Sequence, residues 1–455
     1  MKVKTISRSA DTYVPARNTQ ESALPRNLDP ALHPFERARE YTRAVTATKL
    51  ERMFARPFVG QLGDGHRDGV YCLARNFRTT NQVASGSGDG VVKYWNMTSR
   101  AETLSFRAHY GMVTGLFVSP AGLLSCGDDK TIKLWSLDVN EFGETDDSKV
   151  KTAGLLKTFG GEHAFKGLDH HVSDELFVTG GASVQLWNMS RSNYVANMSW
   201  GADNVNSVRF NRTETNVVAS CGADNSIVLY DIRTSTPVQK VVTNFRANAL
   251  SWNPMEAFHF ASGHEDHNAY LWDMRNLTKS LNIYKDHVSA VTDLDFSPTG
   301  QELVTGSYDK TIRLYRAREG HSRDVYHTKR MQHVFCVGFT TDSRYVLSGS
   351  DDANVRVWRS NASERSNVKS SRERAKLNYD QKLKDRYKYM PEVRRIARHR
   401  HLPSVVKKAQ QIKTVELQSL KRREENARKH SKPAPRVPER QKHVRGTAIK
   451  EDEEQ

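Results

Sequence analysis

The chain has 455 residues and a formal net charge of +17 at pH 7, which is enough for one large repeat domain with extensions. Its four cysteines form no CxxC pair and no zinc-type spacing with histidine, which argues against a structural zinc site and fits a reducing compartment. No apolar run approaches the ~20 residues of a membrane-spanning helix and no signal-peptide core begins the chain, so we expect a soluble intracellular protein with no membrane partner.

The positive charge is concentrated at the two ends of the chain. Residues 1–60 carry a net charge of +5, residues 361–455 carry +14, and residues 61–360 carry −2. Basic segments of this kind contact polyanions, of which nucleic acid is the commonest. Solvated helix faces and a nuclear import signal are the alternative. We define residues 1–52 as a basic N-terminal extension.

A repeat occupies the middle of the chain. Seven similar segments, such as "VVKYWN" and "TIKLWS", end in an aromatic residue, and the gaps between these residues are 40, 52, 43, 42, 43 and 43. The aromatic residues are Trp95, Trp135, Trp187, Tyr230, Trp272, Tyr315 and Trp358. A period of 40–45 with a terminal Trp-Asp-like pair is the signature of WD40 blades. The sequence therefore predicts an all-β, seven-bladed WD40 propeller.

The repeats also carry a polar network. In WD40 blades a turn Asp bonds a His, the His bonds a Ser or Thr, and that residue meets the Trp N–H, which satisfies groups that are costly to bury alone. The first two repeats contain all four members: His66, Ser85, Asp89 and Trp95, then His109, Ser125, Asp129 and Trp135. The sixth has His287, Thr305 and Asp309 with Tyr315 in place of Trp; the fourth and fifth lack the His. The third has no Asp and should be the least regular blade.

Alternating runs before each strand pair, such as "VTGLFV" and "VTDLDF", predict a further strand per repeat. The fourth strand of each blade comes from the linker to the next repeat. No fourth strand follows Trp358, whereas "MFARPFVGQL" (53–62) precedes the first repeat as the other linkers do. We expect 53–62 to be the outer strand of the last blade, which closes a propeller of residues 53–360.

An acidic insertion, residues 138–154, separates the second and third repeats. A loop without a role and a functional loop are both compatible with it. No catalytic motif survives inspection: "SGSGDG" (85–90) lies at a blade turn, and "HEDH" (264–267) contains the turn Asp266. We therefore expect no enzyme activity, no metal or other cofactor and no small-molecule substrate.

The C-terminal region changes to helical periodicity. Residues 361–430 are predicted to be basic and helical, with Pro391 and Pro403 where first turns begin. Val405, Ala409, Ile412 and Val415 lie at helical spacing, so we expect this stripe to be buried against the propeller or a partner. The candidate polyanion contacts are Arg394, Arg395, Arg398, Arg400, Lys407 and Lys408. The Pro-rich residues 431–455 are predicted to be disordered.

The block "ERAKLNYDQKLKDRYKYMPEVRRIARHRHLPSVVKKA" (373–409), after such a ring, resembles the Sof family, as does "PRNLDPALHPFERAREYTRAVTATKLERMFARPFVGQL" (25–62). The resemblance covers nearly the whole chain. It implies a nucleolar, hence nuclear, component of the U-three small nucleolar ribonucleoprotein and the small-subunit processome. The implied partners are pre-ribosomal RNA, the U-three particle and other processome proteins. The implied role is non-enzymatic, in pre-rRNA processing and small-subunit biogenesis.

An alternative comes from metazoan relatives of that family, which resemble substrate receptors of cullin-four ubiquitin ligases and use W-D-x-R at blade ends. This chain has "LYDIR" (229–233) and "LWDMR" (271–275). Arg233 and Arg275 are therefore candidate contacts to a ligase adaptor. The competing interpretation is that an arginine commonly follows this Asp as an ordinary surface residue.

Overall fold

The computed structural model describes residues 34–137, 154–200, 204–364, 368–431 and 437–447. The chain forms two compact units: Met1–Pro57 with Asn361–Arg400, and Phe58–Ser360 with His401–Gln455. Almost all of the acidic insertion lies outside the described residues, as does the chain before Pro34.

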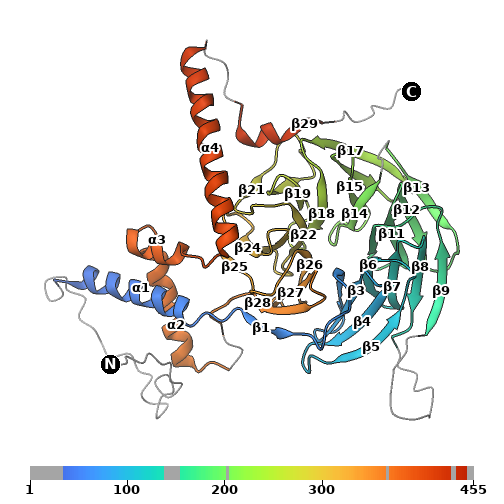
Figure 1. The fold of residues 1–455 in the computed structure, drawn as a ribbon, viewed down its shortest axis with the longest axis horizontal. Helices are drawn as coiled ribbons and strands as arrows, with labels where there is room; N and C mark the ends of the chain where they lie inside the picture. The colour runs from blue at the N-terminus through green and yellow to red at the C-terminus, as the bar shows by residue number, and fades with distance from the viewer. Residues whose placement is uncertain (1–33, 138–153, 201–203, 365–367, 432–436, 448–455) are drawn as a thin grey trace. The chain divides into compact units, whose positions relative to one another are not determined.

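The larger unit is a ring of seven antiparallel sheets within the described residues (Figure 1). The innermost strands are β2 (Val70–Arg75), β6 (Val113–Ser119), β10 (Gly167–His170), β14 (Val205–Phe210), β18 (Ala247–Trp252), β22 (Val291–Phe296) and β26 (Val334–Phe339). The second strands are β3 (Gln82–Ser87), β7 (Gly122–Gly127), β11 (Leu176–Gly180), β15 (Val217–Gly222), β19 (His259–His264), β23 (Glu302–Ser307) and β27 (Tyr345–Ser350). The third strands are β4 (Val91–Asn96), β8 (Thr131–Trp135), β12 (Val184–Asn188), β16 (Ser226–Asp231), β20 (Ala269–Asp273), β24 (Ile312–Arg316) and β28 (Val355–Arg359). The outer strands are β5 (Glu102–Arg107), β9 (Leu155–Gly160), β13 (Tyr194–Met198), β17 (Thr236–Thr243), β21 (Asn282–Tyr284), β25 (Asp324–Tyr326) and β1 (Phe58–Gln61). The predicted seven-bladed propeller is confirmed.

Neighbouring blades share their cores. The second strands are buried along almost their whole length, because both of their faces pack against adjacent blades. One cluster joins Val92 and Leu104 of the first blade to Val113 and Leu123 of the second. The aromatic residues that define the repeat are buried, and four of the tryptophans are fully inaccessible to solvent.

The ring closes through β1, which pairs antiparallel with β28, with Phe58 opposite Trp358 and Gln61 opposite Arg356. Leu62 is fully buried directly after the strand. The strand is shorter than the expected 53–62, because a helix extends to Met53 and Pro57 immediately precedes β1. The closing segment is therefore four residues long.

A belt of hydrogen bonds joins the innermost strands of successive blades. In each case a side chain near the start of one strand donates to a backbone carbonyl of the next blade. The pairs are Cys72 Sγ to Val113 O, Thr114 Oγ1 to Phe165 O, Asn206 Nδ2 to Ala247 O, Asn248 Nδ2 to Val291 O, Thr292 Oγ1 to Val334 O and Cys336 Sγ to Val70 O. Among the described residues no such bond leaves the third blade, whose innermost strand has four residues where most others have six. The third blade, which was expected to be the least regular, thus departs from the others in this belt.

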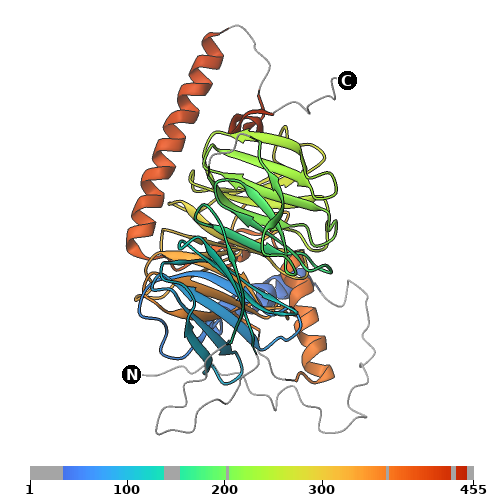
Figure 2. The same cartoon turned by 90° about the vertical axis from the view of Figure 1, so that its right-hand side faces the viewer.

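The propeller unit also includes a long helix, α4 (Ser404–His430), whose distal half stands apart from the strands (Figures 1 and 2). The residues that attach this helix to the ring differ from the apolar stripe that was expected to do so. Val406 is buried and the Lys413 amine donates to His287 O at 2.8 Å, whereas Val405, Ile412 and Val415 remain more than half exposed. Docking therefore uses the helix face next to the predicted one.

Part of the segment predicted to be disordered is ordered, which corrects the prediction for 431–455. A 3-10 helix, η3 (Glu439–His443), leads into β29 (Val444–Thr447), and β29 adds a fifth strand to the outer edge of the fourth blade. Thr447 lies opposite Val241 and Gly446 opposite Val242. The outer edge of β17 offers unpaired backbone groups, and this segment satisfies them although its own composition is polar.

The smaller unit consists of α1 (Glu36–Met53), α2 (Ser371–Arg386) and α3 (Pro391–Arg398). Its core contains Ala44 and Val45 of α1, Leu383 of α2 and Val393 of α3. Ion pairs also link the helices: Lys384 Nζ lies 2.9 Å from Glu51 Oε2, and Arg386 Nη1 lies 2.8 Å from Glu40 Oε2. The N-terminal extension is thus helical in part, which the sequence analysis did not predict.

Candidate interaction surfaces

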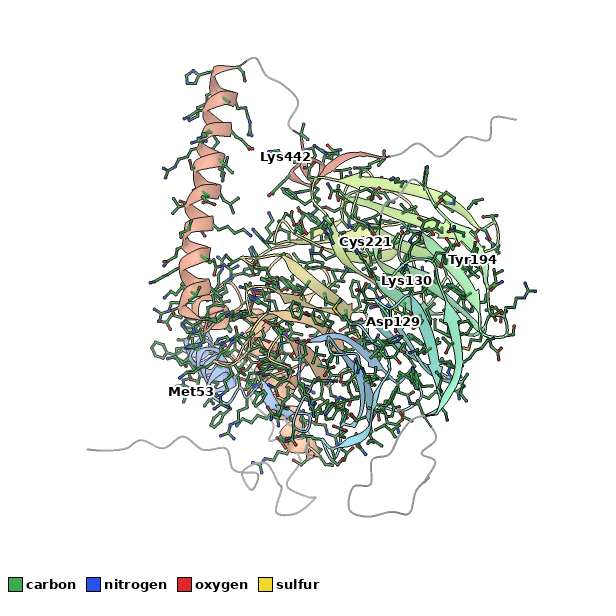
Figure 3. All side chains as sticks on the ribbon, turned by 45° about the vertical axis from the view of Figure 1, so that its right-hand side comes forward. Met53, Asp129, Lys130, Tyr194, Cys221 and Lys442 are labelled. Carbon is green, nitrogen blue, oxygen red and sulfur yellow. The ribbon has the colours of Figure 1, made fainter. Side chains whose placement is uncertain are left out.

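The polar network is complete in the second blade. His109 Nδ1 lies 2.9 Å from Asp129 Oδ1, His109 Nε2 lies 2.8 Å from Ser125 Oγ, and Trp135 Nε1 donates to Ser125 Oγ at 3.0 Å. Burial lowers the pKa of His109, although Asp129 opposes the effect, so the ring is neutral at pH 7. Figure 3 labels Asp129 and Lys130 of this blade. The network fastens the innermost strand's entry loop to the strands behind it.

The sixth blade has a variant of this network. His287 Nδ1 lies 3.0 Å from Asp309 Oδ2, and His287 Nε2 lies 2.7 Å from Thr305 Oγ1. The Tyr315 hydroxyl instead donates to Lys285 O at 2.8 Å. Replacing Trp by Tyr therefore moves the aromatic donor from the network to the backbone of the entry loop.

The first blade departs from the expected network. His66 Nε2 lies 2.6 Å from Ser85 Oγ, and Trp95 Nε1 donates to the same oxygen at 2.7 Å. His66 Nδ1, however, is buried without a hydrogen-bond partner among the described residues. Within the same part of the chain, the Asp89 carboxylate accepts from Val91 N of its own turn at 3.0 Å and from no histidine. Three of the four predicted members are therefore joined here, and Asp89 bonds only within its turn among the described residues.

Two other blades replace the missing His with residues that the motif search overlooked. In the fifth, His264 from the strand itself lies 2.7 Å from Ser262 Oγ, which also accepts from Trp272 Nε1. In the seventh, Arg356 forms an ion pair with Asp352. The signal for His264 was present in "HEDH", but its role required knowing that a strand residue points toward the buried serine.

The turn Asp has a second use that explains why it persists in blades without a His. Its carboxylate accepts from the backbone N–H two residues later, as at Thr131, Ser226, Asn268 and Thr311. The residue between adopts a left-handed backbone, with φ of 61° at Lys130 and 63° at Asn225. The Asp side chain thus stabilises a strained turn.

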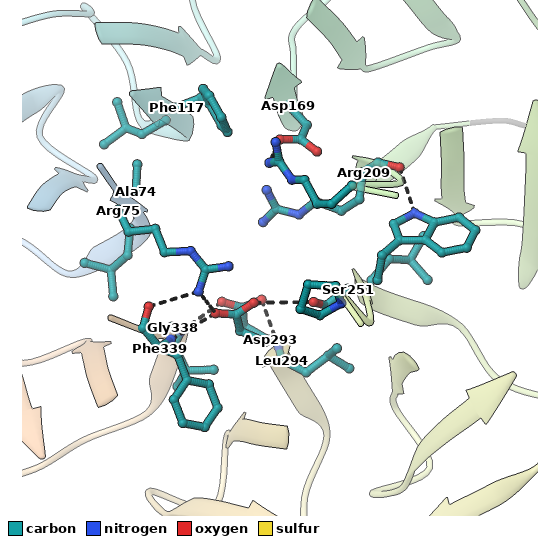
Figure 4. A pocket seen from close by; sticks show the side chains of 18 of the residues that line it. Ala74, Arg75, Phe117, Asp169, Arg209, Ser251, Asp293, Leu294, Gly338 and Phe339 are labelled. Atoms are coloured by element: carbon teal, nitrogen blue, oxygen red, sulfur yellow. Dashed lines mark hydrogen bonds and ion pairs between the residues drawn. The ribbon is translucent and has the colours of Figure 1, made fainter. Parts of the chain in front are cut away.

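A cavity of about 120 Å³ lies in the central channel and is lined by the C-terminal ends of the innermost strands of all seven blades (Figure 4). Its carboxylates accept backbone N–H groups from the next innermost strand. Asp169 Oδ2 accepts from Phe210 N at 2.8 Å, and Asp293 Oδ2 accepts from Val337 N at 2.8 Å. Innermost strands are sheet edges, so these bonds satisfy groups that would otherwise be unpaired.

Two of the three arginines that line the cavity are paired with carboxylates of the channel. Arg75 Nη1 lies 2.9 Å from Asp295 Oδ2, and Arg212 Nη2 lies 2.9 Å from Asp169 Oδ1. Burial raises the pKa of Asp293 to about 6, and the hydrogen bond from Val337 N only partly opposes this. No histidine or cysteine lines the cavity, and its Ser251 hydroxyl donates to Asp295 Oδ1 at 3.4 Å. We interpret the cavity as part of the ring's internal bonding.

Three of the candidate polyanion contacts share one short helix. Arg394, Arg395 and Arg398 are exposed on α3, while Val393 faces the core of the smaller unit. Arg400 differs from the expectation, because its guanidinium donates to the backbone carbonyls of Ala397 and His399. Three candidates on α3 are thus exposed, while the Arg400 side chain contacts carbonyls at the end of that helix.

Lys407 and Lys408 are exposed in the first turns of α4, which belongs to the propeller unit. The six candidates are therefore divided between two compact units. Sequence reasoning missed further exposed cations on α1, because that helix was not predicted. They are Arg37, Arg39, Arg43 and Lys49.

Arg233 and Arg275 occupy equivalent positions after the third strands of the fourth and fifth blades. Arg233 Nη2 lies 3.0 Å from Asp231 Oδ2, and Arg275 Nη2 lies 2.8 Å from Asp273 Oδ2. Both arginine side chains are more than half exposed. The pairing holds the pKa of each Asp below its ordinary value. Each guanidinium is fixed in orientation while its outer edge faces solvent.

Two classes of site were tested on the described part of the chain. No group of three or more His, Cys, Asp or Glu side chains is placed to hold a metal ion there. Among the helices that the structure describes, none has the length and apolar character needed to cross a membrane.

Comparison with known proteins matches the C-terminal region to the Sof1-like domain, over residues 360–444. The chain belongs to the Sof1 family. Five of its repeats also match the WD domain, G-beta repeat, over residues 58–96, 101–136, 195–231, 278–316 and 319–359. The unmatched stretches contain the third and fifth blades, whose polar networks depart from the WD40 pattern.

Two relatives in the Sof1 family cover nearly the whole chain. Protein SOF1 of Saccharomyces cerevisiae is 59% identical over 467 residues, which span 99% of this chain and 96% of the relative. DDB1- and CUL4-associated factor 13 of Homo sapiens is 46% identical over 448 residues, spanning 98% and 99%. The protein is thus a WD40 member of a family of non-catalytic scaffolds, which confirms the predicted family and class.

Proposed function

We propose that this protein is a nucleolar scaffold of the small-subunit processome that acts with the U-three small nucleolar ribonucleoprotein in pre-rRNA processing. The observation that carries the proposal is membership of the Sof1 family, with 59% identity to yeast SOF1 along 99% of the chain. The family resemblance implies this role.

The distribution of charge supports different binding partners for the ring and for the helices of such a scaffold. The propeller sequence, residues 61–360, has a net charge of −2, and Arg75 and Arg212 of its channel are paired with Asp295 and Asp169. The exposed arginines of α3 and the lysines of α4 carry the basic character. The helices therefore suit RNA, and the ring suits protein partners.

Depletion of the protein in cells tests the proposal. We expect unprocessed precursor to accumulate and mature small-subunit rRNA to fall, while large-subunit rRNA is largely spared. Reintroduced wild-type protein should restore processing. Equal loss of both subunit rRNAs, or no loss of either, would contradict the proposal.

A second candidate function is substrate reception for a cullin-four ubiquitin ligase. It is favoured by the relatives called DDB1- and CUL4-associated factor 13 and by the matched geometry of Arg233 and Arg275. In this role the two guanidinium edges would contact the ligase adaptor.

Purification of the full chain discriminates the two functions. Box C/D ribonucleoprotein and pre-rRNA should co-purify under the first, cullin and its adaptor under the second. The Arg233→Ala/Arg275→Ala variant should lose the adaptor only if the second holds. Arg318→Ala is a matched control, because Arg318 has the same position in the sixth blade, is 91% exposed and has no Asp two residues earlier. Loss of adaptor in the control as well would argue against specific contacts.

A further inference from the structure

An aromatic platform lies at the opposite end of the channel from the cavity of Figure 4. Tyr71 and Phe335, the second residues of β2 and β26, stack at 4.6 Å between ring centroids with an interplanar angle of 12°. Tyr308 stacks on His333 at 3.7 Å and meets the Phe335 ring at 6.4 Å with a tilt of 59°. Tyr308 is 46% exposed. The four rings offer faces in two directions.

Two exposed carboxylates adjoin this platform. A Cβ at Gly88 would lie 2.5 Å from Asp68 Oδ2 and 3.0 Å from the Tyr71 ring, and one at Gly69 would lie 3.4 Å from Asp351 Oδ1 and 3.5 Å from that ring. Both carboxylates therefore sit along one edge of Tyr71. Among the described residues, the Asp68 carboxylate accepts only from its neighbour Gly69 N, at 2.7 Å. Within the described part of the chain, neither Asp68 nor Asp351 has a Lys or Arg partner. Burial raises the pKa of the Tyr71 phenol, and both carboxylates act in the same direction.

We propose that this surface, defined by Tyr71, Tyr308, Phe335, Asp68 and Asp351, binds an arginine side chain presented by a protein partner. A guanidinium is planar, stacks on an aromatic face and donates in its own plane to carboxylates, so it satisfies both features at once. A lysine ammonium would meet the charge but not the stacking geometry. RNA is disfavoured, since the two carboxylates repel phosphates. The site is independent of the basic helices and adds a protein contact to the ring.

The full-length chain tests the proposal by fluorescence anisotropy with a labelled peptide of alternating glycine and arginine, and with a matched glycine–lysine peptide. Asp68→Asn/Asp351→Asn should weaken the arginine peptide by about tenfold, and Tyr308→Ala should weaken it by about threefold. The lysine peptide should bind more weakly than the arginine peptide to the wild-type chain. The variants are needed to locate the binding site, because acidic stretches such as residues 451–455 also attract a cationic peptide.

The second blade provides matched controls. Asp128 precedes its turn Asp as Asp351 does in the seventh blade, and Tyr110 is an aromatic residue with 84% exposure that already contacts Arg107 and Lys133. Asp128→Asn and Tyr110→Ala should leave affinity unchanged.

Three results would overturn the proposal. They are unchanged affinity in the Asp68→Asn/Asp351→Asn variant, equal binding of the lysine peptide, and loss of oligouridine binding on Tyr308→Ala. The last would make the surface an RNA contact. Circular dichroism melting separates these results from misfolding, since all three substituted side chains are exposed.

Discussion

His66 shows how one residue can be held in a single protonation state. It is buried, one ring nitrogen meets Ser85 Oγ at 2.6 Å, and the other has no partner. Burial lowers the pKa of His66 to about 4, Lys93 acts in the same direction, and Asp89 opposes them weakly. Because the unfolded value is near 6.5, the unfolded chain binds more protons than the folded chain between these pH values.

Stability should therefore fall as pH decreases through this window. From pH 7 to pH 5 the His66 contribution to the free energy of unfolding should drop by about 2 kcal/mol. The His66→Gln variant keeps a hydrogen-bonding group without a titrating ring, so it should lose less stability over the same interval. Urea unfolding at both pH values measures the difference, with the exposed His163→Gln as control. Identical pH dependence in wild type and His66→Gln would contradict the assignment.

The turn aspartates of the first two blades accept different sets of hydrogen bonds. Asp129 accepts from His109, from Thr131 Oγ1 at 2.7 Å and from Thr131 N at 3.2 Å, whereas Asp89 accepts in its turn alone. Asp129→Ala leaves the buried His109 N–H unpaired and should cost about 2 kcal/mol, and Asp89→Ala should cost about 1 kcal/mol. Chemical denaturation of both variants gives the comparison. A larger loss in Asp89→Ala would show that the turn bond, rather than the histidine bond, stabilises the blade.

At the scale of elements, the ring uses its strand edges in two ways. Among the described strands, β1 and β29 are the two whose hydrogen-bonded neighbour is not the preceding or following strand of the chain. β1 fills the outer position of the seventh blade, and β29 covers the outer edge of the fourth. Both pairings join distant parts of the chain, so they constrain the ring more than a hairpin between neighbours does.

Breaking β1 should thus affect more than one blade. Gly60→Pro introduces a proline into β1, where Gly60 lies opposite Val357 of β28. The matched control, Ala196→Pro, introduces one into β13, where Ala196 lies opposite Leu186 of β12. Proline removes a donor and restricts φ in either strand. We expect Gly60→Pro to lower the unfolding temperature further and to speed hydrogen exchange in β26–β28, because β13 remains tethered within its own blade. Equal effects of the two substitutions would indicate that β1 has no special role in closure.

At the scale of the molecule, charge is separated from the ring. The sequence 61–360 has a net charge of −2, against +14 for residues 361–455. Three exposed arginines on α3 and two lysines on α4 contribute to that excess. The proposed function uses this separation, with a polyanion bound by the helices and proteins bound by the propeller.

Charge reversal tests this separation on the intact chain. Arg394→Glu/Arg395→Glu/Arg398→Glu should weaken single-stranded RNA binding and reduce the salt slope of the affinity by about 2, since each lost phosphate contact removes about 0.7 from the slope. The equally charged control is Arg233→Glu/Arg275→Glu/Arg318→Glu on the ring, which should have a smaller effect. Binding that ignores salt, or that falls equally in both variants, would refute the charge argument. Nucleolar localisation without RNA binding would indicate that the basic residues of the C-terminal region serve as a localisation signal.

The repeat, the number of blades and the start of α3 at Pro391 are readable from the sequence, because each depends on local periodicity or turn chemistry. The closing role of the segment before His66 is long-range, and it was inferred because the last repeat has no fourth strand of its own. Tertiary structure alone decided where long-range partners meet. It packed α1 with α2 and α3 from opposite ends of the chain, placed β29 on the fourth blade, and gave His264 the role of a missing loop histidine. The first two pairings join segments that lie far apart in the sequence, and the role of His264 depends on the direction in which a strand residue faces once the blade has formed. Local sequence patterns therefore specify none of the three.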